Sequence, residues 1–259
     1  MKTIISGLIN FILKFVEVKK NRILFQSGRN KVDCAPYAIY EYLKKNDPNS
    51  YETIWVVEKG TDVSMLNKGD YYYWNTLKGI YYMATSKYWI RSQSLGGIVK
   101  KKNNQIYIQT YHGAGAFKKV GYDVDGLKAT EPPLHARDWD FLIATDDYNK
   151  EALISSLALK IPILVVGNPT TDLIINKKQD FKINLAKKLG LDTSKKVVLY
   201  APTFRDHELN KEGINLPILS LGKLKNTTVL LRLHPLIINK IKDIKLPKNF
   251  IDVGFYPNI

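Results

Sequence analysis

The stretch IYIQTYHGAGAFKKVG, residues 106–121, joins a strand-like run to a glycine-rich turn. Open α/β sheets place their ligands where a strand ends in such a turn. His112 is a base whose ordinary pKa lies near neutrality, and glycines let the backbone approach a ligand closely. The other candidate ligand-binding groups of the turn are Gly113, Gly115, Lys118 and Lys119. These residues predict a phosphate-handling site with a built-in base; the alternative is a surface turn whose histidine is solvated.

Strands and helices alternate on both sides of this stretch. Apolar runs typical of buried strands lie at residues 22–27, 52–58, 71–74, 88–91, 106–111, 140–145 and 161–166. Segments whose apolar residues have helical spacing separate several of them, at residues 36–45, 76–86 and 148–159. Buried strands that alternate with helices predict an α/β fold with a parallel sheet covered on both faces.

A second α/β unit is expected to begin near Ser194, after a basic helix at residues 180–191 that we interpret as a bridge. Strand-like runs recur at residues 197–200, 228–233 and 250–253, with a helix at residues 216–224. We therefore expect one Rossmann-like domain at residues 21–192 and the start of another at residues 193–259. A parallel sheet of about three strands leaves much apolar surface uncovered, so we expect the second domain to be incomplete here.

Charge is the strongest signal in the composition. The 259 residues include 39 lysines and arginines against 24 acidic residues, which gives a net charge of +15. Such a chain favours polyanions: nucleic acid, an anionic membrane or a phosphate-rich substrate. No zinc-finger spacing or RNP-like pattern supports nucleic acid. The single cysteine, Cys34, excludes an internal disulfide and a cysteine-based zinc site, and we interpret it as a packing residue.

Residues 1–20 have the pattern of an amphipathic helix. The apolar run is shorter than the roughly 20 residues that a membrane span needs. Its apolar residues recur at helical spacing: Ile5, Leu8, Ile9, Ile12, Leu13 and Val16. Basic residues lie close by: Lys2, Lys14, Lys19, Lys20 and Arg22. This combination predicts a helix that lies on an anionic membrane surface; the alternative is a helix that packs on its own domain.

Two further motifs place polar groups after a strand. In APTFRD, residues 201–206, Thr203 and Arg205 could bind phosphate oxygens, or Arg205 could instead pair with Asp206 in a surface loop. In RLHP, residues 232–235, His234 directly follows a buried strand and could pack there or act with His112 as an acid/base or phosphate-clamping pair. The remaining histidines, His135 and His207, are expected to be solvated or structural.

These segments, in this order, resemble the bacterial CDP-glycerol glycerophosphotransferases, which include teichoic acid primases and polymerases and related capsule enzymes. The family's HGTPLKKLG is similar to HGAGAFKKVG at residues 112–121, and its LYAPTWRD is similar to LYAPTFRD at residues 199–206. Its RPHP resembles RLHP. Weaker matches are NRILFQS at residues 21–27, AIYEYL at residues 38–43, ETIWVV at residues 52–57 and DVGFYPNI at residues 252–259.

The resemblance implies a GT-B arrangement of two Rossmann-like domains with the active site between them, attached peripherally to the cytoplasmic face of the membrane. Residues 21–192 would form the acceptor side and residues 193–259 the donor side. A polyol phosphate, such as glycerol phosphate, would pass from a CDP-polyol to a hydroxyl of a lipid-linked wall or capsule polymer, releasing CMP. His112 would be the catalytic base and His234 would hold the donor pyrophosphate. Further substrate contacts would come from Gly113, Lys118, Lys119, Thr203, Arg205 and Arg232; no metal or cofactor is implied.

The chain departs from the family pattern at several positions. Ala114 replaces a threonine, Leu233 replaces the first proline of RPHP, and Thr170 replaces the arginine of G-x-P-R-x-D. A D-Y-S-S segment of the family has no match, so we expect a truncated member that releases little CMP by itself. Two alternatives stay open: a GT-B glycosyltransferase that uses a nucleotide sugar, and a noncatalytic module that binds an anionic polymer or membrane.

Overall fold

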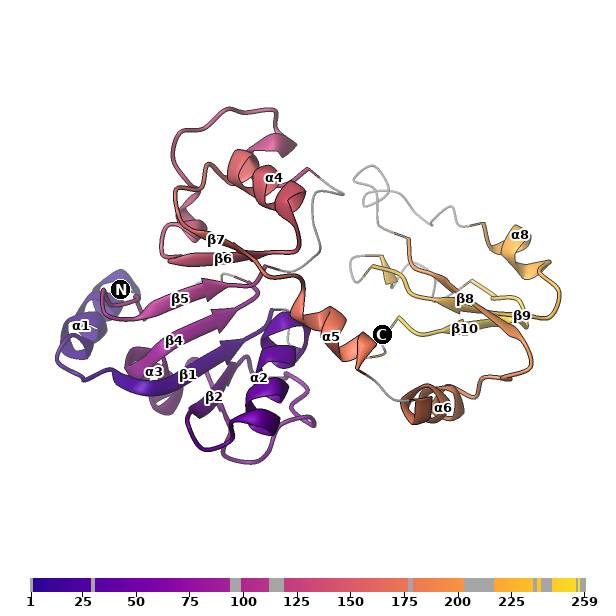
Figure 1. Cartoon of the computed structure of the whole chain (residues 1–259), viewed down its shortest axis with the longest axis horizontal. Helices are drawn as coiled ribbons and strands as arrows, with labels where there is room; N and C mark the ends of the chain where they lie inside the picture. The colour runs from indigo at the N-terminus through magenta and orange to yellow at the C-terminus, as the bar shows by residue number, and fades with distance from the viewer. Residues whose placement is uncertain are drawn as a thin grey trace. The chain divides into compact units, whose positions relative to one another are not determined.

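The computed structural model describes residues 2–28, 31–93, 99–111, 119–176, 179–202, 217–234, 237–238, 244–254 and 256. The chain divides into two compact units, Met1–Asn176 and Lys177–Ile259. Figure 1 shows strands and helices in both units. Each unit is an α/β structure built on a parallel sheet, as the sequence predicts.

Among the described residues of the first unit, seven parallel strands form one sheet in the order β3-β2-β1-β4-β5-β6-β7 (Figure 1). The strands are β1 (Lys19–Gln26), β2 (Glu52–Val57), β3 (Tyr71–Tyr73), β4 (Ser86–Arg91), β5 (Ile106–Gln109), β6 (Phe141–Ala144) and β7 (Ile163–Val165). The chain first adds strands on one side of β1 and then returns to its other side with β4. Parallel sheets bind ligands at the carboxyl ends of the strands beside such a reversal, here β1 and β4.

Helices cover both faces of this sheet because adjacent residues of a strand point to opposite faces. Leu24 lies in one core cluster with residues of α3 and α4, whereas Phe25 lies in another with Tyr40 of α2. The helices of the unit are α1 (Lys2–Leu13), α2 (Cys34–Asn46), α3 (Leu77–Thr85), α4 (Asp147–Leu157) and α5 (Pro169–Ile175), with 3-10 turns η1 (Gly121–Val124) and η2 (Leu134–Ala136).

Side-chain caps fix where several helices begin. The Thr76 hydroxyl accepts from the Gly79 amide at 3.2 Å before α3, and the Asp146 carboxylate accepts from the Asn149 amide at 2.7 Å before α4. Asn168 does the same for Thr170 at 3.0 Å before α5. Such caps satisfy amides that have no partner within the helix. They orient each helix at the point where it leaves the sheet.

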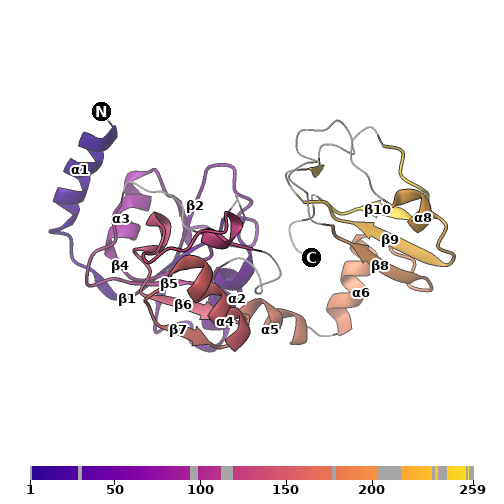
Figure 2. The same cartoon turned by 90° about the horizontal axis from the view of Figure 1, so that it is seen from above.

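In the described part of the second unit, three parallel strands form a sheet in the order β10-β9-β8. The strands are β8 (Lys196–Tyr200), β9 (Thr227–Leu231) and β10 (Phe250–Asp252), accompanied by helices α6 (Gln179–Lys188) and α8 (Ile218–Gly222) (Figure 2). β9 is buried along its whole length, whereas Val197 and Leu199 of β8 are each about half exposed. Sequence analysis included the helix at residues 180–191 in the domain of residues 21–192. In the structure this helix, α6, belongs to the second unit.

Candidate active site

Three buried polar side chains lie side by side at the carboxyl ends of β1, β4 and β5. Gln26 is in register with Arg91, and Arg91 is in register with Gln109. The backbone pairing continues one residue further, because the Thr110 amide donates to the Arg91 carbonyl at 2.7 Å. Polar side chains at this edge of a parallel sheet are typical of a ligand site. Sequence analysis did not select Gln26, Arg91 or Gln109. The arginine that ends the apolar run YWIR could have indicated a polar group at this strand end.

Arg91 brings a buried positive charge to this edge. Its guanidinium carbon lies 5.1 Å from the centre of the Tyr107 ring and 5.6 Å from that of Trp89. Burial lowers the pKa of this guanidinium, and the neighbouring Tyr107 and Asp138 counteract the shift. An arginine nonetheless stays charged in a protein, and aromatic faces stabilise a desolvated cation. A buried positive charge therefore lies beside Trp89 and Tyr107 at the carboxyl end of β4.

The strand β5 leads directly to the predicted catalytic turn through Tyr111. Tyr111 has a positive φ of 57°, and its amide donates to Oε1 of Gln109 at 2.9 Å. The predicted base His112 follows it, but residues 112–118 lie outside the described residues. The roles of His112, Gly113 and Lys118 therefore stay predictions.

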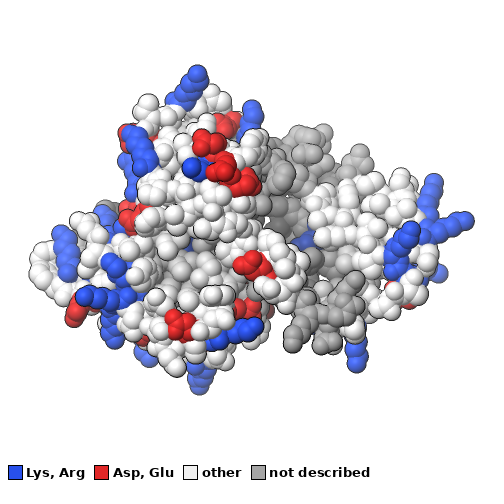
Figure 3. All heavy atoms as spheres, in the orientation of Figure 1, with Lys and Arg blue, Asp and Glu red and all other residues white. Residues whose placement is uncertain are grey.

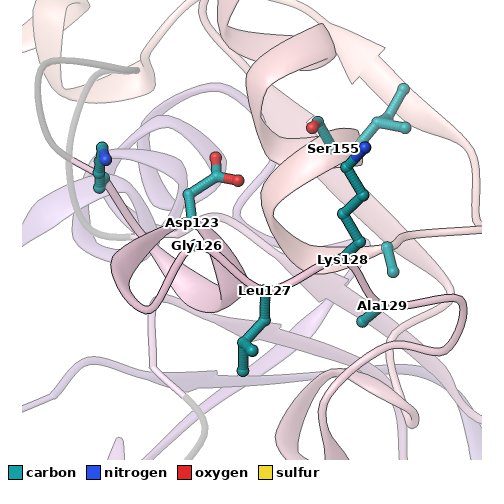
Figure 4. A pocket seen from close by; sticks show the side chains of 9 residues that line it. Asp123, Gly126, Leu127, Lys128, Ala129 and Ser155 are labelled. Atoms are coloured by element: carbon teal, nitrogen blue, oxygen red, sulfur yellow. The ribbon is translucent and has the colours of Figure 1, made fainter.

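Lys119 is exposed where the described chain resumes after that turn. It lines a pocket of about 610 Å³ between residues 119–129 and the last turn of α4. Figure 4 shows the side chain of Lys128 extending beside Ser155, whereas that of Asp123 lies apart from them, on the 3-10 turn η1. Gly121, with φ 52°, lets its own backbone lie close to the last turn of α4. A Cβ at this position would lie only 2.3 Å from the Ser156 carbonyl oxygen. Both a lysine and a carboxylate line the pocket, so it is not a simple anion site.

In the second unit, Arg232 links the ends of two strands. Its Nη1 donates to the carbonyl oxygens of Val253 at 3.1 Å and of Tyr256 at 2.9 Å. The guanidinium therefore joins the segment that follows β9 to the segment that follows β10. Lys188 of α6 reaches the same segment, with its Nζ 5.4 Å from the centre of the Tyr256 ring. A substrate contact by Arg232 stays a prediction, next to this structural role.

His234 begins a turn after β9. Its carbonyl oxygen accepts from the amides of Ile237 at 2.9 Å and Ile238 at 3.1 Å, and its side chain is half-buried. Leu233, which replaces a proline of the family pattern, is buried in the core of the unit. Thr203 and Arg205 lie outside the described residues, so the predicted phosphate contacts of APTFRD stay predictions. The pairing of His234 with His112 also stays a prediction.

Two residues outside these motifs have clear environments. His135 is exposed, with its ring edge-on to Trp139 at 5.8 Å between centres. Burial, followed by the nearby Asp33, raises the pKa of the Cys34 thiol to about 12. A thiol with such a pKa is protonated at neutral pH and is a poor nucleophile. Within the described residues, no group of three or more histidine, cysteine or acidic side chains could hold a metal ion.

Helix α1 has one side on the first unit and one side in solvent. On the inner side, Leu13 packs against the core, and Asn10 Oδ1 accepts from the Lys100 amide at 2.8 Å. The Lys102 ammonium also donates to the Val16 carbonyl after the helix. The outer side exposes large apolar side chains: Leu8, Phe11, Ile12 and Phe15. Figure 2 shows α1 at the edge of its unit.

The basic surface beside α1 differs from the predicted one in two ways. Arg22 is only 2% exposed, and its guanidinium contacts both carboxylate oxygens of Glu52, at 2.9 and 3.0 Å. The prediction that Arg22 belongs to a membrane-facing basic group is therefore wrong. Lys100 and Lys102, distant in sequence, contact Asn10 and Val16 instead. Among the described helices, none has the length and apolar character needed to cross a bilayer.

The fold and these strand-end motifs together define a two-unit α/β protein with polar groups at the carboxyl edges of its sheets. The sequence model of the CDP-glycerol:poly(glycerophosphate) glycerophosphotransferase family matches residues 8–259, and the chain belongs to this family. It is 32% identical to a teichoic acid poly(glycerol phosphate) polymerase of Bacillus spizizenii, over 85% of this chain and 60% of that protein. It is also 32% identical to one of Staphylococcus epidermidis, over 93% of this chain and 36% of that protein.

A solved structure of the wall teichoic acid polymerase TagF has the same fold, with a TM-score of 0.81 and 28% identity. The match covers 99% of this chain and 67% of that one. Another TagF structure, of a histidine-to-asparagine variant soaked with CDPG, matches with a TM-score of 0.80 and 27% identity, over 99% of this chain and 67% of that one. The chain thus spans 60% or less of the two curated relatives described and about two thirds of these solved chains.

Proposed function

We propose that this chain takes part in moving a polyol phosphate from a CDP-polyol to a hydroxyl of a teichoic-acid or capsule-type polymer, with release of CMP. The family match over residues 8–259 carries this proposal. The relatives are named as polymerases of poly(glycerol phosphate), which favours glycerol phosphate as the transferred unit. The CDPG present with TagF favours a CDP-linked donor.

The proposed reaction needs a base and stabilised phosphate charge. The acceptor hydroxyl forms a new O–P bond, the bond from that phosphorus to CMP breaks, and His112 takes the hydroxyl proton. Cationic and N–H donors offset the negative charge that CMP carries away. His234, Arg205 and Thr203 would supply such donors on the donor side. The buried charge of Arg91 below the end of β5 would favour an anionic substrate on the acceptor side.

We extend the proposal to the roles of the two units. The first unit would bind the acceptor and the second the CDP-polyol, in a GT-B arrangement whose active site lies between them. In support, each unit presents family motifs at strand ends: β5 leads to residues 112–121, β8 to residues 201–206 and β9 to residues 232–235.

CMP release tests the substrate class. In a chimera, the 85% of this chain that aligns with the Bacillus spizizenii polymerase would replace the matching part of that protein, so that its residues work in a full-length setting. We expect CMP release from CDP-glycerol when a polymer acceptor is added, and little release from the purified chain alone. Release of UDP from a UDP-sugar, with no CMP from CDP-glycerol, would favour a glycosyltransferase. Salt-sensitive polymer binding without nucleotide binding would favour the noncatalytic alternative.

We also propose that the protein lies peripherally on an anionic membrane surface at its cytoplasmic face, through α1. The exposed side chains of Leu8, Phe11, Ile12 and Phe15 would enter the headgroup boundary. Lys100, which is exposed beside the helix, would add about 1 kcal/mol near an anionic leaflet, whereas Lys101 is already paired with Asp140. Lysine and arginine side chains project from both units in Figure 3, in keeping with an anionic surface as partner. A lipid-linked acceptor would be met at that surface.

A further inference from the structure

Tyr111, immediately before His112, has a backbone conformation that non-glycine residues seldom adopt. Its φ of 57° lies in the left-handed region, which is unfavourable for a residue with a Cβ atom. Such residues persist only where the surroundings fix them, and they cluster at functional sites. The group that fixes Tyr111 therefore controls the direction in which the chain leaves β5.

That group is the amide side chain of Gln109. Its Oε1 accepts from the Tyr111 amide at 2.9 Å, and its side chain is 1% exposed. The residue between them is held as well, because the Thr110 amide donates to the Arg91 carbonyl at 2.7 Å. The Tyr111 ring is half-buried against the core of the first unit. The backbone on both sides of this bond is thus anchored to the sheet.

We propose that Gln109 is a positioning residue for His112: its buried amide holds Tyr111 in the left-handed conformation and so aims the chain at the point where the histidine begins. The inference rests on the proposed role of His112 as the base. A base must be held within a narrow range of positions by groups that are themselves fixed. Gln109 is so fixed, because it lies at the end of a central strand of the sheet.

Gln105 offers a matched control at the other end of β5. It is also 1% exposed, and its Nε2 donates to the carbonyls of Met83 at 2.9 Å and Ser86 at 2.6 Å. Replacement of either glutamine by leucine leaves buried polar groups without a bond and lowers stability. Only replacement of Gln109 removes the oxygen that accepts the hydrogen bond of the Tyr111 amide. A general loss of stability can therefore be separated from a loss of positioning.

The experiment is carbon-edited NMR of the ring signals of the four histidines, with amide hydrogen exchange, on the whole chain. We expect Gln109→Leu to move the His112 ring signal and to speed exchange of the Tyr111 amide roughly tenfold. Gln109→Glu keeps an acceptor oxygen and should restore both. Gln105→Leu should leave the His112 signal in place. A His112 signal unmoved by Gln109→Leu, or moved equally by Gln105→Leu, would overturn the proposal.

Tyr111→Pro covers the case in which Gln109→Leu does not fold. Proline has no N–H and holds φ near −65°, so this variant removes both the bond and the left-handed conformation without touching the buried glutamine. It should move the His112 signal while the His135 signal stays in place, and an unmoved His112 signal would again contradict the proposal. These readouts need no transfer activity, so they can fail or succeed independently of the proposed reaction.

Discussion

The burial of Arg22 and its ion pair with Glu52 could not be predicted from the sequence around it. This arginine lies close after Lys19 and Lys20, so sequence alone grouped it with a basic surface. Its partner Glu52 lies on the neighbouring strand, and only the register of β1 with β2 brings the two together. Gln109 is similar, since its bond to Tyr111 depends on a backbone angle that sequence analysis did not consider. By contrast, β5 ends shortly before residues 112–121 and β9 ends directly before RLHP, as the sequence predicted, although residues 112–118 lie outside the described residues.

We expect Arg22→Ala to lower the free energy of unfolding by about 2–4 kcal/mol, because it leaves Glu52 without its cation and opens a buried space. Urea unfolding followed by circular dichroism measures the loss. The control is Lys44→Ala, which removes the more exposed ion pair with Asp70 and should cost about 1 kcal/mol or less. Equal losses in the two variants would show that burial of the Arg22 pair does not matter.

Helix α1 shows how far elements can be predicted. The spacing of apolar residues was enough to predict a helix near the N-terminus, and the structure has one at Lys2–Leu13. Spacing cannot say which apolar side chains are covered, because that depends on distant segments. Here the covering segment includes Lys100 and Lys102, which contact Asn10 and Val16. The helix packs on its unit and also exposes apolar residues, and its contact with a membrane stays a prediction.

A prediction at this scale concerns the exposed side of α1. The double substitution Phe11→Ser and Phe15→Ser should reduce sedimentation with vesicles rich in anionic lipid, because it removes the two exposed aromatic rings from the interface. Tyr148→Ser, at an exposed position on α4, is the control and should sediment like the unaltered chain. Equal sedimentation of all three proteins would count against a membrane-facing role of α1. Salt should weaken the binding, because part of it is electrostatic.

The start of α4 gives a second prediction. Two adjacent aspartates, Asp146 and Asp147, stand at this point, and Asp146 is the cap, because its carboxylate accepts from the Asn149 amide. Asp146→Ala should lower the free energy of unfolding, because the Asn149 amide loses its acceptor. Asp147→Ala, inside the first turn, should cost less, since it removes only the interaction with the helix dipole. The reverse order in thermal unfolding would contradict this assignment.

At the scale of the whole molecule, the sequence predicted two parallel α/β units, and the structure has both. The division falls between Asn176 and Lys177, ahead of the helix that sequence analysis took as a bridge. Periodicity identifies helices but not the sheet on which each one packs. Helix α5 packs against α2 of the first unit, whereas Lys188 of α6 contacts Tyr256 of the second. Such long-range contacts, rather than local composition, decide where one unit ends.

The role of His112 as the base of a glycerol phosphate transfer is tested most directly by CMP release from the chimera and from two histidine variants of it. We expect His112→Ala to lower kcat by about 100-fold or more with the fold retained, because a general base contributes about that much. His135→Ala, which alters an exposed histidine beside Trp139, should leave kcat unchanged. Near-normal CMP release by the His112→Ala chimera would contradict the account.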